Sequence, residues 1–330
     1  MNEAGAISKI SQLELLSSNG QHAHGNIKAV FFRAWLTYRH GSADAALRTI
    51  DSAITNIPNI HLDTSLANFY ILKGQCFVKK TQFNLAQEAF KNALTIAEQR
   101  NDLLLKSNTM ISIGWAYMED GKPKEAIDFF NEVLSVNPGK SYENRALLLC
   151  NIAACHNTLG NFRMAESYAQ AGIAVARLQQ SMTDLANGLN ILARSYYQQG
   201  HMERAIRLMK EASLYRQKMA DPSMLASDYL ELGTLYLKNH QPEYALPWAT
   251  RAEKISLEHG NALKTVAAYE LLADVYNALG NAPASVGFYK KMLYLKDSLS
   301  DDSYNQSMAA MQVAFEAEKK NAENLRLKKE

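Results

Sequence analysis

Residues 110–133 read MISIGWAYMEDGKPKEAIDFFNEV, and this stretch contains the pattern that decides the fold. Apolar and small side chains fall three or four residues apart up to Tyr117, stop at Gly121, and resume with the same spacing from Ala126. Such spacing places side chains on one face of an α-helix, and glycine readily adopts the left-handed conformation that ends one. The stretch therefore predicts two amphipathic helices joined by a tight turn.

The same pattern returns along the chain. The small residue near the start of each copy occupies positions 34, 74, 114, 153, 193, 233 and 273, separated by 40, 40, 39, 40, 40 and 40 residues. A constant period indicates structural units that stack on their neighbours. We therefore expect an all-α array of about seven helical hairpins over residues 27–296. The predicted ends of first helices include Gly121, Gly160, Gly200 and Gly280.

The composition excludes several classes of protein. The 330 residues are 47% hydrophobic and 21% charged, as in a folded chain rather than a disordered or fibrous one. With 35 basic and 33 acidic side chains the net charge is +2, which gives no basic field to attract nucleic acid or an anionic membrane. Residues 1–25 do not resemble a signal peptide, and no stretch is apolar enough to span a membrane. We expect a cytoplasmic protein, or an extracytoplasmic one if a signal or membrane segment lies outside this sequence.

Motifs for catalysis or metal binding are missing from the sequence. The eight histidines are scattered, with neither a His-Glu-x-x-His pair nor a Cys-x-x-Cys motif. Gly139-Lys140-Ser141 resembles the end of a phosphate-binding loop, but Leu134 stands where that loop needs a glycine. No Gly-x-Ser-x-Gly elbow is present. We predict no enzyme activity, no metal and no cofactor.

Three residues of the fourth hairpin are predicted to serve the core. Cys150 and Cys155 would lie about 140° apart around a helix, so buried thiols are favoured over a disulfide. His156 occupies the offset at which other copies carry tyrosine or phenylalanine. A packed or hydrogen-bonded core histidine is therefore favoured over a ligand.

The hairpins resemble tetratricopeptide repeats, whose pattern is Trp-x2-Leu-Gly-x2-Tyr followed by Ala, an aromatic residue, Ala and Pro. The resemblance covers about residues 27–296, although no copy has the first Trp, only Pro138 occupies the proline site, and the period exceeds the common 34 residues. It implies a right-handed superhelical solenoid whose first helices line a concave groove that binds an extended peptide or a helix.

Carried over to this sequence, the resemblance implies a set of inward-facing residues on the first helices. An asparagine ladder suits a peptide main chain, because each amide can donate and accept at once. Solvated side chains, or side chains that tie neighbouring hairpins together, are the alternatives, and the two aromatic residues could equally belong to the core. The candidate binding residues are Asn108, Trp115, Asn151, Asn187, Asn190, Arg194, Tyr197, Glu231, Glu270 and Asp274, and the same face includes Asn68, Gln75, Asn157 and Asn277.

The kind of partner is only weakly indicated. Some tetratricopeptide-repeat proteins clamp chaperone tails with Lys and Asn on consecutive turns, but Ile111 with Trp115, and Cys150 with Ala154, fill those places here. A chaperone-tail adaptor is therefore disfavoured. The acidic residues near the end of the array favour a partner with basic groups.

The two ends of the chain are predicted to differ from the repeats. Residues 1–26 are expected to form a leader or a capping helix. Residues 297–330 predict one amphipathic helix, with an apolar stripe formed by Met308, Met311, Phe315, Ala322 and Leu325. The segment 315–325 resembles the joining helix that follows such repeats in bacterial sensor proteins. The alternatives are a solenoid cap and a helix that forms a homodimer.

These observations predict a non-catalytic scaffold that binds a protein or peptide. Because no output domain is recognisable, the resemblance implies the sensory or regulatory part of a bacterial signalling protein. The alternative is a stand-alone adaptor for complex assembly, in which the last helix is only a cap.

Overall fold

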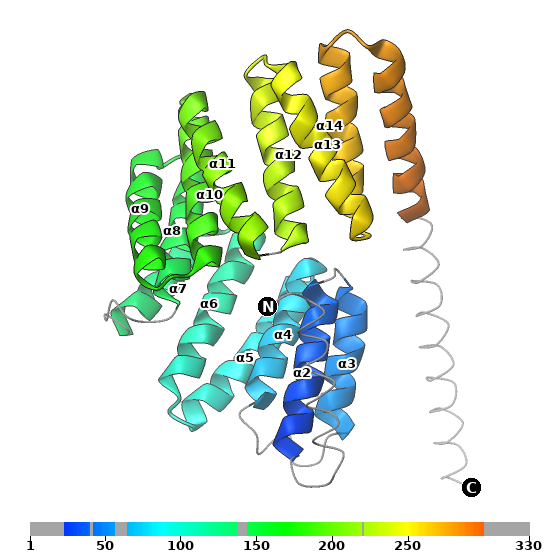
Figure 1. The fold of residues 1–330 in the computed structure, drawn as a ribbon. Coiled ribbons are helices and arrows are strands. Elements are labelled where there is room, and N and C mark those ends of the chain that lie inside the picture. Colours follow the sequence, from blue (N-terminus) through cyan, green and yellow to red (C-terminus); the bar gives the residue numbers. More distant parts are fainter. Residues whose placement is uncertain (1–22, 40–41, 57–64, 137–143, 220, 300–330) are drawn as a thin grey trace, which may run out of the picture. The chain divides into compact units, whose positions relative to one another are not determined.

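The computed structural model describes residues 23–39, 42–56, 65–136, 144–219 and 221–299. Every regular element within these ranges is an α-helix, which confirms the all-α prediction for the described part of the chain (Figure 1). Most of the predicted leader 1–26, the turn that contains Pro138 and residues 139–141, and the C-terminal stretch from residue 300 onward lie outside these ranges.

The chain divides into two compact units, Met1–Asp221 and Pro222–Glu330. The sequence did not predict this division, because the 40-residue spacing continues unchanged from Ala193 to Gly233. Each unit is described by itself.

The first unit is a series of helix pairs in which each helix packs on the next along the chain. The pairs are α2 with α3, α4 with α5, α6 with α7, α8 with α9, and α10 with α11. The bounds are α2 Ala23–Arg39, α3 Ala43–Asn56, α4 Ser65–Lys79, α5 Phe83–Gln99, α6 Leu103–Glu119, α7 Pro123–Val136, α8 Arg145–Thr158, α9 Phe162–Leu178, α10 Met182–Gln198 and α11 Met202–Met219.

The second unit has the same organisation. It contains α12 (Pro222–Lys238), α13 (Pro242–Glu258) and α14 (Ala262–Ala278), followed by a helix at 282–299. Helix α12 pairs with α13, and α14 packs on both. Prolines at the starts of α12 and α13 suit the first turn, where their missing N–H costs no helical hydrogen bond.

Small residues allow the two helices of a pair to approach closely. A Cβ atom added to Gly114 on α6 would lie 2.4 Å from Cε1 of Phe130 on α7, and one added to Gly74 would lie 2.4 Å from Cε1 of Phe90. Both rings are fully buried. The absent side chain of each glycine therefore makes room for an aromatic ring on the second helix, as the repeat pattern predicted.

The predicted glycine stops are confirmed. Gly121, Gly160, Gly200 and Gly280 have φ angles of 71°, 74°, 81° and 75°, the left-handed region that favours glycine. At Gly160 the backbone N–H donates to the carbonyl of Asn157 at 3.1 Å, which closes the last turn of α8 before α9 begins.

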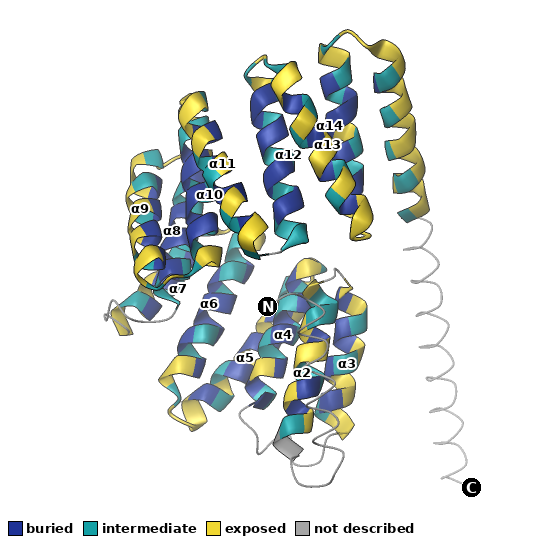
Figure 2. Ribbon diagram, in the orientation of Figure 1, coloured by how far each residue is buried: buried dark blue, intermediate teal, exposed yellow. Residues whose placement is uncertain are grey.

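Each pair also buries apolar side chains against the pair before it. Phe69, Leu72 and Cys76 of α4 join one buried cluster with residues of α2 and α3, such as Ile27 and Ile50. In Figure 2 the buried residues lie on the sides of the helices that face each other, and the exposed residues lie on the outer sides. The core is therefore continuous from one pair to the next within a unit, as expected for a solenoid.

The predicted core roles in the fourth hairpin are confirmed. Cys76, Cys150 and Cys155 are free, buried thiols, and burial raises the pKa of each to about 12. The ring of His156 stacks on Tyr168 with centroids 5.5 Å apart. Burial lowers the pKa of His156, so the neutral imidazole is favoured in the fold.

Candidate functional site

The first helices of successive pairs lie on the same side of the first unit. Helix α2 contacts α4, α4 contacts α6, α6 contacts α8, and α8 contacts α10, in addition to the contacts within pairs. In the second unit α12 contacts α14 in the same way. The surface formed by the first helices is therefore continuous within each unit, and we call it the inner face.

An apolar hollow opens on the inner face between α2 and α4. Its volume is about 230 Å³. Phe32 and Trp35 remain 44% and 38% exposed, whereas Leu72 is almost completely buried. Phe31 is held in place by an edge-on contact with the buried ring of Phe69, with centroids 5.4 Å apart. The lining residues are Phe31, Phe32, Trp35, Asn68, Ile71, Leu72 and Gln75.

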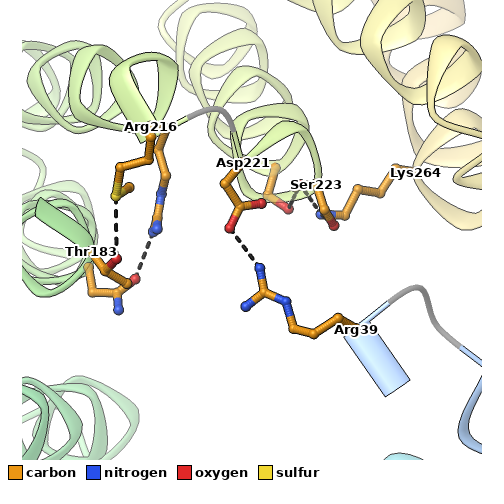
Figure 3. A network of polar contacts seen from close by, with 9 residues as sticks. Arg39, Thr183, Arg216, Asp221, Ser223 and Lys264 are labelled. Carbon is orange, nitrogen blue, oxygen red and sulfur yellow. Dashed lines mark hydrogen bonds and ion pairs between the residues drawn. The ribbon is translucent and has the colours of Figure 1, made fainter. Parts of the chain in front are cut away.

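Polar groups flank this apolar surface. Nε2 of Gln75 donates to Oγ of Ser112 on α6 at 3.4 Å, which orients its amide, and Asn68 is exposed. The guanidinium of Arg39 lies 5.4 Å from the ring centre of Trp35 and forms an ion pair with Asp221 at 2.8 Å (Figure 3). An apolar surface next to oriented amides can hold an apolar side chain together with the main chain that carries it.

Several predicted asparagines tie helices together. Oδ1 of Asn108 accepts from Nδ2 of Asn144 at 2.6 Å, and Nδ2 of Asn157 donates to the carbonyl of Ile191 at 3.0 Å. These bonds join α6 to the start of α8 and α8 to α10. In both asparagines, therefore, the side chain ties neighbouring hairpins together, which was one of the alternatives to peptide binding.

Asn187 has a structural partner within its own pair. Its Oδ1 accepts from Nη2 of Arg216 at 2.7 Å, and this arginine on α11 is only 1% exposed (Figure 3). Nearby, the hydroxyl of Thr183 donates to Sδ of Met219 at 3.3 Å. The amide of Asn187 therefore serves the internal packing of α10 on α11.

The other predicted residues of the first unit also lie on its first helices. Asn151, Asn190 and Tyr197 are half-buried and Arg194 is exposed. Trp115 is partly buried and packs against the buried cluster of Val78, Ala86, Phe90 and Ala116.

The acidic residues belong to the second unit. Glu231 on α12 is half-buried, and Glu270 on α14 is exposed. Asp274 accepts a hydrogen bond from the hydroxyl of Tyr289, and this bond raises the pKa of that tyrosine. In the same unit, Nζ of Lys264 donates to Oγ of Ser223 at 3.0 Å, which ties α14 to α12 (Figure 3).

The hollow was missed in the sequence, although a signal was present. The resemblance placed Gln75 and Trp115 on the inner face, and each follows the small residue of its copy by one position. The same offset in the first copy gives Trp35. Its neighbours Phe31 and Phe32 complete a group of three aromatic residues within five positions.

The described helices include none that is both long enough and apolar enough to cross a membrane. Within the same ranges, no three His, Cys, Asp or Glu side chains come together as metal ligands would.

Comparison with known proteins identifies the kind of repeat. Residues 65–138 match the family model of the tetratricopeptide repeat. Residues 65–138 are tetratricopeptide repeats. Tetratricopeptide repeat protein 29 of Macaca fascicularis is 23% identical over 181 residues, which are 55% of this chain and 32% of the relative. The chain thus spans about a third of the length of the curated relative that it matches.

Solved structures share the fold of this chain. A Rap protein complexed with competence and sporulation factor is 13% identical, with a TM-score of 0.63 over 90% of this chain and 98% of that one. A Signal Transduction ATPase with Numerous Domains with a tetratricopeptide repeat sensor, from Pyrococcus horikoshii, is 18% identical, with a TM-score of 0.60 over 84% of this chain and 43% of that one. At these identities the likeness shows the fold alone. Tetratricopeptide repeats form protein-interaction scaffolds and are generally not catalytic.

Proposed function

We propose that this chain binds a peptide, or an extended segment of a protein, on the inner face of its first unit. In this proposal the hollow between α2 and α4 anchors an apolar side chain of the partner. The observation that carries the proposal is the partly exposed pair Phe32 and Trp35 above the buried Leu72, with Asn68 and Gln75 beside them.

The size and chemistry of the hollow favour a peptide over a small molecule. Pockets that enclose small ligands have volumes of roughly 300–1,000 Å³. The hollow, at about 230 Å³, is smaller and holds one or two side chains. Aromatic residues at protein interfaces contribute a large share of binding energy, and amides recognise a main chain through paired hydrogen bonds.

Selection of peptides from a random 12-residue library, with the full chain as bait, provides a probe. We expect the selected peptides to share an aliphatic or aromatic residue, and Trp35→Ala to weaken their binding by about tenfold or more. Leu178→Ala is the matched control, because Leu178 is an exposed apolar residue of the same unit on the second helix α9. Equal affinity of the two variants would contradict the proposal.

The predicted ladder is tested in the same assay. A variant with Asn151, Asn190 and Arg194 all changed to alanine removes ladder side chains without touching the hollow. Weaker binding in this variant and in Trp35→Ala would mean that the peptide runs along the inner face from α2 to α10. An effect of Trp35→Ala alone would confine the contact to the hollow.

We further propose that the chain is the sensory or regulatory part of a bacterial signalling protein. The support is the fold shared with the Rap protein complexed with competence and sporulation factor and with the Pyrococcus horikoshii protein that has a tetratricopeptide repeat sensor. A sensory segment has to report occupancy of its ligand site elsewhere in the chain. We therefore expect a selected peptide to change amide hydrogen exchange in the helix at 282–299. Unchanged exchange there would favour the stand-alone adaptor.

A further inference from the structure

The two helices that line the hollow carry charge of one sign. Helix α2 contains Lys28, Arg33 and Arg39, helix α4 contains Lys73 and Lys79, and neither helix contains Asp or Glu. Three basic residues on α2 and two on α4 give a formal charge of +5, whereas the whole chain carries +2. The first helices α6 and α10 each contain one basic and one acidic residue. Positive charge is therefore concentrated on the two helices of the hollow.

Three of these basic residues share a helix face with the side chains of the hollow. Arg39 follows Trp35 by four residues, and Lys79 follows Gln75 by four, so each lies one helical turn further along the same face. Lys28 precedes Trp35 by seven residues, which is two turns. Each helix of the hollow thus ends its inner face with a basic side chain, and α2 also begins with one.

Arg39 and Lys79 lie close enough to influence each other. The guanidinium of Arg39 lies 5.4 Å from the ring centre of Trp35, and Nζ of Lys79 donates to the carbonyl of Tyr38 at 3.1 Å. Burial lowers the pKa of Lys79, and the positive charge of Arg39 lowers it as well. An anion bound beside both groups would relieve this repulsion.

A carboxylate already lies on Arg39. Oδ2 of Asp221, the last residue of the first unit, accepts from Nη2 of Arg39 at 2.8 Å, although 182 residues separate the two in the sequence (Figure 3). The two side chains remain 45% and 21% exposed, and ion pairs with such exposure contribute little to stability. The guanidinium that flanks the hollow therefore binds a carboxylate, and a second carboxylate can replace the first at little cost.

We propose that the partner segment is acidic, with an Asp or Glu side chain within a few residues of the apolar one that enters the hollow, and that this carboxylate replaces Asp221 on Arg39. The inference rests on the proposed function, because the hollow must bind the apolar residue. A planar guanidinium holds a carboxylate through two parallel hydrogen bonds, and Lys79 adds a second positive charge. Asp221 thereby acts as an internal competitor, which an acidic peptide displaces and a neutral one does not.

The third copy restricts where the acidic side chain binds. Glu119 on α6 is exposed and stands at the offset that Arg39 and Lys79 occupy in their copies. Like charges brought together at an interface oppose binding. We therefore expect the acidic residue of the partner at α2 and α4, and not further along the inner face.

Peptide variants test the inference without any change to the protein. A peptide selected by the full chain is synthesised with an amidated C-terminus, once as selected and once with its acidic residues changed to Asn or Gln. We expect the neutral version to bind about fivefold more weakly, and the acidic version alone to lose affinity at high salt. Equal affinity of the two versions would overturn the inference. Loss of binding on amidation would overturn it as well, since the terminal carboxylate would then be the group that binds.

Protein variants locate the charge that matters. Arg39→Gln removes the proposed partner of the carboxylate, and Arg33→Gln is the matched control, because it removes the same charge from the same helix. Arg33 occupies the offset of Lys73, whose Nζ forms an ion pair with Asp51 on α3 at 2.7 Å. We expect Arg39→Gln to weaken binding of the acidic peptide and not of the neutral one, and Arg33→Gln to affect neither. Equal effects of the two variants would overturn the assignment to Arg39.

Asp221→Asn distinguishes replacement of a carboxylate from general attraction. The variant removes the competitor, so the acidic peptide should bind about two- to fivefold more tightly and the neutral one as before. Unchanged affinity for the acidic peptide would overturn the replacement. Trp35→Ala separates this inference from the proposed function. If it weakens both peptides while the variants at Arg39 and Asp221 weaken or strengthen neither, only the acidic partner is wrong; if it too has no effect, the proposed function fails.

Discussion

The same substitution, glycine to alanine, is expected to have opposite effects at two positions in this chain. At Gly114 the new Cβ would lie 2.4 Å from Cε1, 2.8 Å from Cζ and 2.9 Å from Cδ1 of Phe130. Ordinary carbon contacts begin at about 3.5 Å. Phe130 is 0% exposed, so its ring cannot move into solvent, and overpacking of this kind costs about 1–3 kcal/mol. Alanine regains about 1 kcal/mol of helix propensity, which leaves a net loss of up to about 2 kcal/mol.

At Gly287 nothing opposes the substitution. This glycine lies inside the helix at 282–299, has no positive φ, and a Cβ there would meet no atom within 4 Å. Only the helix propensity changes, so Gly287→Ala should stabilise the chain by about 0.5–1 kcal/mol.

Urea unfolding followed by circular dichroism measures both effects as shifts of the midpoint. Repeat arrays need not unfold in one step, so amide exchange should be measured together with urea unfolding. The exchange is followed in α6 and α7 for Gly114→Ala and in the helix at 282–299 for Gly287→Ala. The chain itself suggests a rescue. Ala193 and Met209 occupy the offsets of Gly114 and Phe130 and are both buried, so adding Phe130→Met should restore part of the stability. If Gly114→Ala raised the midpoint as much as Gly287→Ala does, the packing argument would be wrong.

Three further predictions follow from buried polar groups. Because burial lowers the pKa of His156, the imidazole binds a proton more tightly in the unfolded chain than in the fold, and its contribution to stability is present above pH 6.5 and is lost as the pH falls below that value. The fall in Tm between pH 7.5 and pH 5.5 should therefore be smaller in His156→Tyr than in the unchanged protein. An equal fall in both would argue against a role of His156 in the pH dependence. The Cys150 thiol, with its pKa raised to about 12, should stay unlabelled by Ellman's reagent at pH 8 until guanidinium unfolds the chain; rapid labelling of the native chain would show that the helix pair opens. Asn157→Ala should reduce the free energy of unfolding by about 1 kcal/mol in urea titrations, since the bond to the Ile191 carbonyl is lost, whereas no change would mean that this bond adds nothing net.

The sequence predicted most of the fold, because the fold depends on local periodicity. The constant spacing of small residues gave the helix pairs, and the glycine stops at positions such as Gly160 adopt the expected φ. Contacts that depend on the identity of a distant side chain were not predictable. Nothing near Asn187 in the sequence shows that its amide would meet the buried Arg216, 29 residues away. The division after Asp221 was also missed, since the repeat spacing passes through it unchanged.

The candidate site shows why an inward-facing position alone does not identify a binding residue. Trp35 and Gln75 share one offset in successive copies, and each faces the same position of the next first helix. For Gln75 that neighbour is Ser112, whose hydroxyl accepts its amide hydrogen bond at 3.4 Å. For Trp35 the neighbour is Leu72, which has no hydrogen-bonding side-chain atom and lines the hollow with the indole. The bond to Ser112 uses the Gln75 side chain to join neighbouring first helices, whereas Trp35 beside Leu72 stays 38% exposed. Binding residues in such an array are therefore found by comparing each inward position with its neighbour in the next copy.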